Sequence, residues 1–339
     1  ASGPVTLPFS NLSASMSGTL TVTAQHVADL KAGKLYVNFH SPGHPAGEIR
    51  GQIIPQGAQF FTAPLVGEEE VPKVSSTATG FASVILSADR TEVRYHMATT
   101  ATPTASHLHK GVAGVSGPVV VPFTVSGSGA DGTATVTADT ATDLEKGRLY
   151  ANVHTAGHGS GELRGQMRKP GEQVFTATLA GGQEVPPVSS SNTATVQVLL
   201  DRTQTGIRYE GVTTATVTAS HLHLAPGGVS GPVSVPFSAT LSGSATVNAD
   251  QVTALTGGLL YANIHTAANP GGELRGQVLR PGEKLYTAVM NGANEVPPNA
   301  STGTGGLQVV LNAAGDHFVC AGSFTGLTGT PSAAHLHLV

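Results

Sequence analysis

The sequence predicts an all-β protein of three tandem Greek-key β-sandwich units of about 110 residues, each with one short helical turn. One observation is a repeated ending, Leu-Tyr-x-Asn-x-His followed by Gly-Glu-x-Arg-Gly-Gln, at 35–52, 149–166 and 260–277. A second is the triplet His-Leu-His at 107–109, 221–223 and 335–337. A third is the run of short Val-, Thr- and Ala-rich segments between Gly, Pro, Asp and Ser residues. Because these motifs recur along the chain, the repeat has to be assigned before any other feature of the fold.

The two motifs place one unit across the ends of the sequence, because the ending occurs first at residue 35 and the triplet first at residue 107. We therefore divide the chain into a leading half (1–59), unit one (60–173), unit two (174–284) and a trailing half (285–339). Joining 335–339 to 1–5 reproduces the passage that follows His107 and His221, shorter by three residues. The halves thus complement each other.

Half of a sandwich exposes strand edges and an uncovered apolar face. Three arrangements fit the sequence: closure of the halves within one chain, completion of each half by a neighbouring molecule, or a window of a longer tandem array. A head-to-tail contact that does not close propagates as a filament. We expect a longer array or such a polymer.

The elements of unit one follow in order. A helical turn is predicted at 139–147, because Asp139 can cap it, acids come early and Gly147 ends it; 25–33 and 250–257 occupy the same place. The strands are expected at 59–66, 80–87, 92–99, 105–109, 119–125, 132–137, 148–155 and 161–168.

The last two strands form a hairpin with one apolar and one polar face. Alternation places Leu149, Ala151 and Val153 together, and Tyr150, Asn152 and His154 on the opposite side. The polar side also receives Glu162, Arg164 and Gln166 from the second strand. Two interpretations remain open for these last residues: a solvated face with a Glu–Arg pair, or part of a site.

The histidines indicate a metal site in each unit. His107 and His109 share one strand face, with Leu108 turned inward, and His154 is the natural third ligand. Three imidazoles without thiolate or carboxylate suit copper, with zinc as the alternative, and Glu162 is a candidate for orienting an imidazole. A hydrogen-bonded cluster or a polar face for an organic ligand are the other interpretations. The equivalent sets are His221, His223 and His265 in unit two, and His335, His337 and His40 in the split unit; His26, His44, His96, His158 and His317 are expected at the surface.

Composition excludes several classes. A net charge of −4 without a basic stripe argues against nucleic acid as a partner, and no apolar run is long enough for a spanning helix. No signal-peptide pattern is visible, and Ala1 in place of Met fits a processed or partial chain. The single Cys320 excludes an internal disulfide framework and is expected to be buried in a strand at 316–321.

At three passages the sequence resembles the CHRD domain, first described in chordin and found in secreted bacterial proteins. The passages are Gly182-Gln-Glu-Val-Pro-Pro-Val188, His221-Leu-His with Gly231-Pro-Val233, and the ending at 260–277, and their equivalents recur along nearly the whole chain. The resemblance implies an extracellular or cell-surface β-sandwich protein and little about its chemistry. Chordin binds secreted growth factors, but nothing in this chain points to such a partner.

The His-x-His pattern also resembles copper-zinc superoxide dismutase, although no metal-bridging His, Asp-centred zinc loop or disulfide is evident. We therefore expect an extracellular structural protein that assembles head-to-tail and binds one metal ion per unit. The alternatives are a copper redox enzyme of the dismutase type and a secreted adhesion or ligand-binding module.

Overall fold

The computed structural model describes residues 3–9 and 18–338, and most of its regular elements are strands. The expected all-β class is confirmed. The α-helices of the described residues lie where the helical turns were predicted, and a short 3-10 turn follows the first strand of each repeat. Their bounds are α1 (Ala24–Lys31), α2 (Ala138–Glu145) and α3 (Ala249–Thr256), with η1 (Gly67–Glu69), η2 (Gly181–Gln183) and η3 (Gly292–Asn294).

Unit one is a sandwich of two antiparallel sheets, close to the predicted strand list. Its core lies between the sheets and includes Phe61, Val84, Leu108 and Leu163, all fully buried. One sheet has the order β3 (Gln59–Leu65), β4 (Gly80–Leu86), β5 (Glu92–Thr99), β9 (Gly129–Thr135) and β8 (Val125–Ser126). The other has the order β11 (His158–Gln166), β10 (Leu149–Thr155), β6 (Pro103–Lys110) and β7 (Val119–Phe123).

Unit two repeats this arrangement, except that its two layers are hydrogen-bonded into one continuous sheet. The bridge between Ala180 and Arg275 connects the two layers, and the bridge between Val66 and Arg164 is its counterpart in unit one. The strand order is β16 (Val233–Phe237), β15 (Ala219–Leu224), β18 (Leu260–His265), β19 (Leu274–Gln277), β12 (Gln173–Ala180), β13 (Thr193–Leu200), β14 (Gly206–Thr213) and β17 (Ser242–Thr246).

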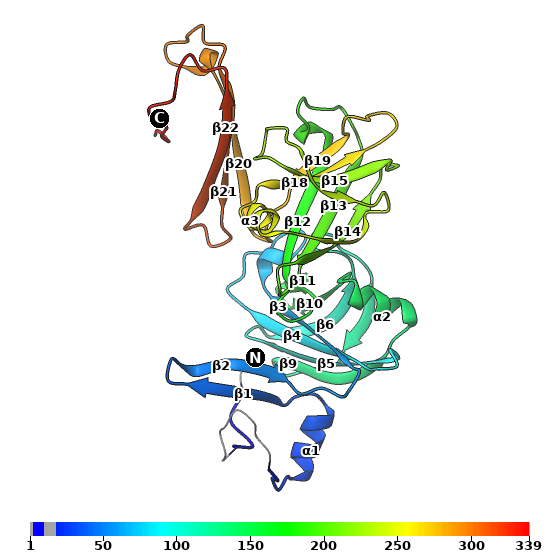
Figure 1. The fold of residues 1–339 in the computed structure, drawn as a ribbon. Coiled ribbons are helices and arrows are strands. Elements are labelled where there is room, and N and C mark those ends of the chain that lie inside the picture. The colour runs from blue at the N-terminus through cyan, green and yellow to red at the C-terminus, as the bar shows by residue number, and fades with distance from the viewer. Residues whose placement is uncertain (1–2, 10–17, 339) are drawn as a thin grey trace.

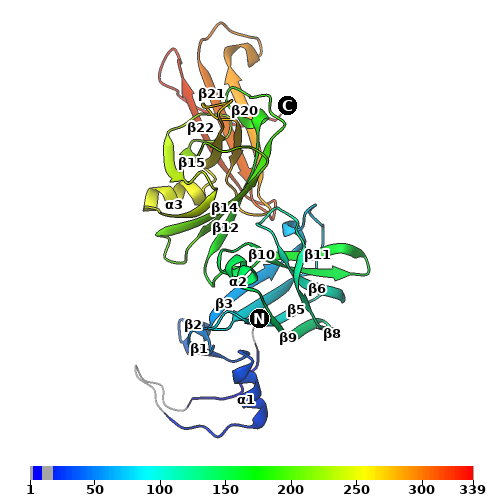
Figure 2. The ribbon, with the colours of Figure 1, turned by 90° about the vertical axis from the view of Figure 1, so that its right-hand side faces the viewer.

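The two halves lie at opposite ends of the molecule, with units one and two between them (Figures 1 and 2). The leading half contributes α1 and a hairpin, and the trailing half a three-stranded sheet. The hairpin is β1 (Tyr36–Ser41) and β2 (His44–Gln52), and the sheet is β20 (Lys284–Asn291), β21 (Thr304–Leu311) and β22 (Phe318–Thr325). The structure therefore shows no closure of the halves within one chain among the residues it describes.

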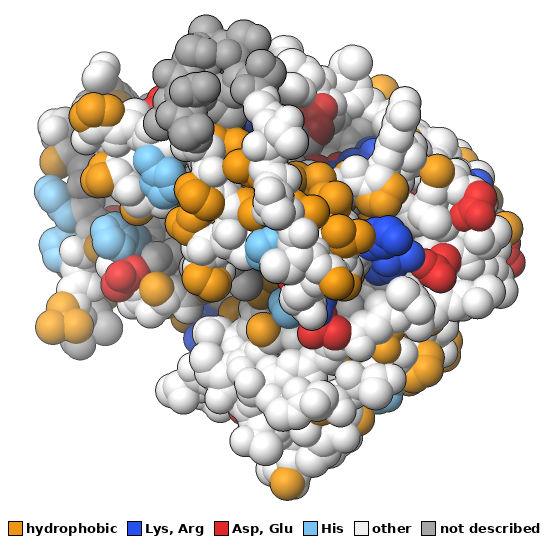
Figure 3. Space-filling view, turned by 90° about the horizontal axis from the view of Figure 1, so that it is seen from below, with side chains coloured by type: hydrophobic (Ala, Val, Ile, Leu, Met, Phe, Trp, Pro, Cys, Tyr) orange, Lys and Arg blue, Asp and Glu red, His pale blue; other side chains and the backbone are white. Residues whose placement is uncertain are grey.

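Each half exposes side chains that are core residues in the complete units. Phe318 pairs with Leu311 as Val93 pairs with Leu86, yet Phe318 is 56% exposed and Val93 only 1%. Ile49 of the leading half is 63% exposed, whereas its counterpart Leu163 is fully buried. Hydrophobic side chains accordingly gather on the end of the molecule that carries the leading half (Figure 3).

Cys320 differs from its predicted environment, because it is exposed. It lies on β22, at the edge of the trailing sheet, and no second layer covers it among the described residues. Its pairing with Val309 matches the pairing of Tyr95 with Val84, and Tyr95 is a core residue of unit one. The prediction of a buried Cys320 is therefore wrong, because burial at this position depends on a second sheet.

Successive segments meet through one repeated contact. After each helix a glycine in the left-handed region turns the chain against a strand of the next segment, because only glycine adopts that conformation freely. Gly33 packs on Ile85 of β4, Gly147 on Leu199 of β13, and Gly258 on Val310 of β21. No helix of the described residues is both long and apolar enough to cross a membrane.

Candidate metal centre

The three predicted ligands of unit one lie on neighbouring strands. Strand β6 pairs antiparallel with β10 so that His107 is opposite Asn152 and His109 opposite Tyr150. His154, two residues beyond Asn152, then reaches the same face as His107, while Leu108 is fully buried on the core side. The ring centroids of His107 lie 5.4 Å from His109 and 5.1 Å from His154.

The nitrogens of this cluster are arranged as ligands would be. One ring nitrogen of each of the three histidines lies within 4.8 Å of the others. His109 Nδ1 lies 2.9 Å from the carbonyl oxygen of Gly117, and His154 Nδ1 lies 3.1 Å from that of Gly159. A carbonyl only accepts, so both Nδ1 atoms carry the proton and both Nε2 atoms keep a lone pair.

Those lone pairs have no hydrogen-bond partner among the described residues. The buried unpaired atoms include His107 Nδ1, His109 Nε2 and His154 Nε2. A buried nitrogen without a partner costs about 1–3 kcal/mol, and native proteins contain few such atoms. Three such nitrogens on residues whose ligand atoms lie within 4.8 Å of one another could hold one metal ion.

Unit two carries the same cluster in His221, His223 and His265. His223 Nδ1 contacts the carbonyl of Gly231, and His265 Nδ1 contacts that of Pro270, both at 2.9 Å. His221 Nδ1 forms a hydrogen bond of 3.3 Å with His265 Nε2, so of this cluster only His223 Nε2 is buried and unpaired among the described residues. Two nitrogens each about 2.0–2.1 Å from one metal would be about 3.3–3.6 Å apart, so this pair already has the spacing of two ligands.

The environment favours the neutral form of two histidines in each cluster. Burial lowers the pKa of His107 and His109, and the neighbouring imidazoles lower it further. The same causes lower the pKa of His221 and His223. A neutral imidazole is the form that a metal ion would require.

Arg164 supports the cluster from within the protein. It is 1% exposed, and its Nη2 donates to the carbonyl oxygens of Val112 and Val115. Gln166 is also buried and donates through Nε2 to the carbonyl oxygens of Gly111, Gly147 and Leu149. The solvated-face interpretation is therefore wrong for both residues.

The remaining polar residues of the hairpin have structural partners. Asn152 is buried and donates to Glu70 at 2.6 Å. Glu162 accepts from Ser76 and Thr155, each at 2.6 Å, and faces His158 at 3.4 Å. These contacts correct the expectation that Glu162 orients a metal-ligating imidazole, because backbone carbonyls hold His109 and His154.

The third predicted set is divided between the two ends of the molecule. His335 and His337 have ring centroids 5.5 Å apart, close to the spacing of His107 and His109. His40 Nδ1 contacts the carbonyl of Pro45 at 3.0 Å, as His154 contacts Gly159. Within one chain the structure does not bring His40 to the other two (Figure 1).

The loop that follows the triplet was not among the predicted functional segments. Residues 111–118, ending in Ser-Gly-Pro, supply the carbonyl that fixes His109. The recurrence of Ser-Gly-Pro-Val at 116–119 and 230–233 was the signal that could have assigned this role. Of the five histidines expected at the surface, His96 and His158 are partly exposed and face the carboxylates of Asp131 and Glu162.

Fold and site together define a class of tandem β-sandwich proteins with a half-buried cluster of three histidines in each complete unit. Comparison with known families matches the CHRD domain over residues 1–53, 61–167, 175–278 and 286–339. The chain belongs to the CHRD domain family. Comparisons with curated proteins and with solved structures gave no significant match.

Proposed function

We propose that this protein is an extracellular structural protein whose CHRD units each bind one copper ion, with zinc as the alternative metal. The observation that carries the proposal is the convergence of three buried lone pairs, on His107 Nδ1, His109 Nε2 and His154 Nε2. Three neutral imidazoles favour copper or zinc over calcium or magnesium, which prefer oxygen ligands.

The metal would act on stability. An ion that binds only the folded unit stabilises it by mass action, by about 2.7 kcal/mol when the free ion is at 100 times its Kd. CHRD domains occur generally in secreted or extracellular proteins and are generally not enzymes. Such a setting favours a metal that reinforces a structural unit.

Head-to-tail assembly is the second part of the proposal. The trailing half of one molecule and the leading half of the next would form one sandwich, with His335 and His337 from the first and His40 from the second. Both halves expose the side chains that are buried in complete units, among them Phe318 and Ile49.

The leading half already has the conformation it would need. Tyr36 receives a hydrogen bond from Gly3 N at 3.1 Å, as Tyr150 does from Gly117 N at 3.2 Å. Arg50 lies over the ring of Tyr36 at 3.4 Å, as Arg164 lies over Tyr150 at 3.5 Å. Association would therefore require little ordering of this half.

A copper redox enzyme is the alternative, because three ligands leave an open position on the metal. Arg164 could steer an anionic substrate only from the surface, but it is buried against the ring of Tyr150. A ligand-binding face of Tyr150, Asn152 and His154 is also less favoured, since the first two are buried. Superoxide turnover above that of free copper would favour the enzyme.

Metal binding is tested by elemental analysis of protein exposed to copper or zinc and then dialysed. We expect one ion in unit one and one in unit two, and His107→Ala with His109→Ala should remove only the first. His96→Ala is the matched control, because His96 lies outside the clusters. Protein that retains no metal after dialysis, while remaining folded, would refute the proposed site.

Assembly is tested by light scattering and electron microscopy of the chain with and without copper. We expect polymers that Ile49→Asp or Phe318→Asp abolishes, because each places a charge in the joined core. Val119→Asp is the control, since Val119 is 47% exposed in a complete unit. Monomers at every concentration, or polymers unaffected by both core variants, would overturn the head-to-tail joint.

A further inference from the structure

The loop 111–118 connects the metal ligands of unit one to unit two. At one end, Gly117 accepts from His109 through its carbonyl and donates through its N–H to Tyr150. At the other end, Ala113 N donates to Gln197 Oε1 at 2.8 Å, and Gln197 belongs to β13 of unit two. Each neighbour of the loop therefore holds it at a different point.

Gln197 is buried, and both the oxygen and the nitrogen of its side-chain amide form hydrogen bonds. It is 0% exposed, and its Nε2 donates to the carbonyl of Gly147 at 2.9 Å. The tip of the loop adds an apolar contact, because Ala113 packs with Val174 and Leu199 of unit two. A buried amide with both ends paired across an interface fixes the position of that interface.

The next junction repeats this arrangement with different residues. Gly227 N donates to Gln308 Oε1 at 2.7 Å, and Gln308 Nε2 donates to the carbonyl of Gly258 at 2.8 Å. Gly227 belongs to the loop whose Gly231 carbonyl fixes His223. Gln308, like Gln197, is fully buried.

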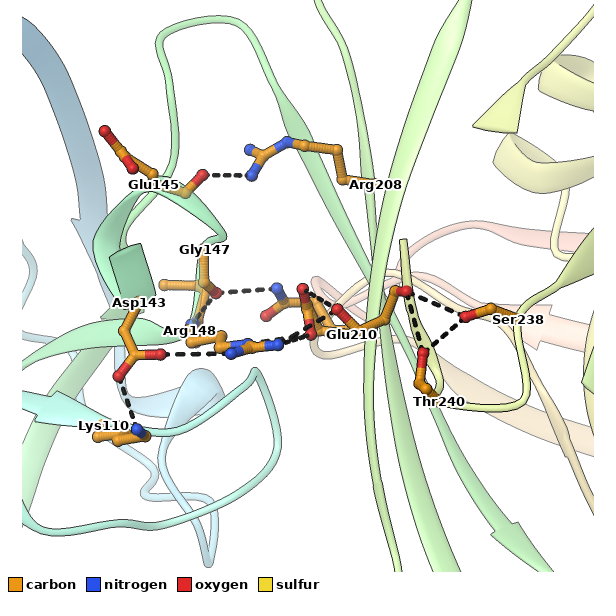
Figure 4. Close-up of polar contacts among 12 residues, drawn as sticks. Lys110, Asp143, Glu145, Gly147, Arg148, Arg208, Glu210, Ser238 and Thr240 are labelled. Atoms are coloured by element: carbon orange, nitrogen blue, oxygen red, sulfur yellow. Dashed lines mark hydrogen bonds and ion pairs between the residues drawn. The ribbon is translucent and has the colours of Figure 1, made fainter. Parts of the chain in front are cut away.

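The junction contains an ion pair as well (Figure 4). Arg148 Nη2 of unit one contacts Glu210 Oε2 of unit two at 2.6 Å, and Arg208 donates to the carbonyl of Glu145 at 2.6 Å. Arg94 donates to the carbonyl of Lys31 in the same way at the junction between the leading half and unit one. These arginine contacts dock the units, whereas Gln197 also hydrogen-bonds the loop whose Gly117 carbonyl contacts His109.

We propose that Gln197 and Gln308 are positioning residues for the metal site of the preceding unit, so that metal binding and unit docking are coupled. This inference rests on the proposed function. Docking would hold the loop, the loop would hold the imidazole of His109 or His223, and the lone pair would point at the metal. By linkage, a bound metal would strengthen docking by the same factor.

The test uses the full chain in two backgrounds. His221→Ala with His223→Ala leaves the site of unit one, and His107→Ala with His109→Ala leaves that of unit two. Gln197→Ala and Gln308→Ala are placed in each, and the Kd for Cu²⁺ is measured by competition with a chelator. We expect Gln197→Ala to raise the Kd of the unit-one site about threefold to tenfold, less than direct loss of a ligand's own hydrogen-bond partner.

The crossed design separates positioning from general loss of stability. Gln197→Ala should leave the unit-two site unchanged, although Gln197 belongs to β13 of unit two, and Gln308→Ala should do the reverse. An unchanged Kd, or equal effects of both variants on both sites, would overturn the inference alone. No copper binding in either background would overturn the proposed function and this inference with it.

Discussion

The guanidinium carbon of Arg164 lies 3.5 Å from the centroid of the Tyr150 ring, and His109 stacks on the same ring at 5.0 Å. Tyr150 belongs to β10, between the strands that carry the other two residues. A buried cation, an aromatic ring and an imidazole of the histidine cluster therefore lie against one another on three neighbouring strands. Unit two repeats it with Arg275, Tyr261 and His223.

Loss of Arg164 should destabilise unit one strongly. Arg164→Ala removes the donor to the carbonyls of Val112 and Val115 and leaves a cavity beside Tyr150. We expect a loss of about 3–5 kcal/mol in the free energy of unfolding, measured by denaturant titration. Arg164→Lys should restore little of it, because a point charge replaces a planar fork. Lys169→Ala, at an exposed position, should stay within about 0.5 kcal/mol.

The ion pair between Arg148 and Glu210 should contribute to unit docking. Its side chains are 28% and 8% exposed, so solvent screens the pair only in part. A double-mutant cycle with alanine should give a coupling energy of about 1–3 kcal/mol in the unfolding free energy. The more exposed pair of Arg90 and Glu145, inside unit one, should give less than about 1 kcal/mol. Equal coupling energies for the two pairs would contradict a role of the Arg148–Glu210 pair in docking the units.

Glu273 should make unit two sensitive to acid. Donors from Asn192, Ser190 and Thr266 lower its pKa to about 2. The folded state therefore binds a proton less readily than the unfolded state, so this stabilisation is complete above about pH 4.5 and is lost as the pH falls toward 2. Glu273→Gln should weaken the dependence of unfolding free energy on pH across that window. An unchanged slope would show that other groups dominate.

Chelation should lower the melting temperature of copper-loaded protein. A metal ion held at the proposed sites would stabilise only the folded state, so its removal would cost the binding free energy. The variant His109→Ala with His223→Ala should melt at the same temperature with and without chelator, because each cluster has lost a ligand that the loop carbonyl orients. Differential scanning calorimetry measures both effects. A chelator response that survives in the double variant would place the metal elsewhere.

The strands and the histidine clusters were predictable because each follows from a short local pattern. Alternation alone places His107 and His109 on one face, and the repeat identifies His154 as their partner. Burial of Arg164 was not predictable, since a charged side chain at a polar-face position normally meets solvent. Its partners are carbonyls of Val112 and Val115, 52 and 49 residues away, and backbone groups leave no trace in side-chain patterns. Exposure of Cys320 depends on a layer that lies outside its own half.

The left-handed turns at Gly33, Gly147 and Gly258 have φ angles of 65°, 71° and 68°. Each lies where one segment leaves the previous one, and each packs on the equivalent strand residue of the next segment. A contact that is repeated head to tail without closure generates a screw axis. A longer assembly that reused one such contact at every step would therefore wind with a single hand.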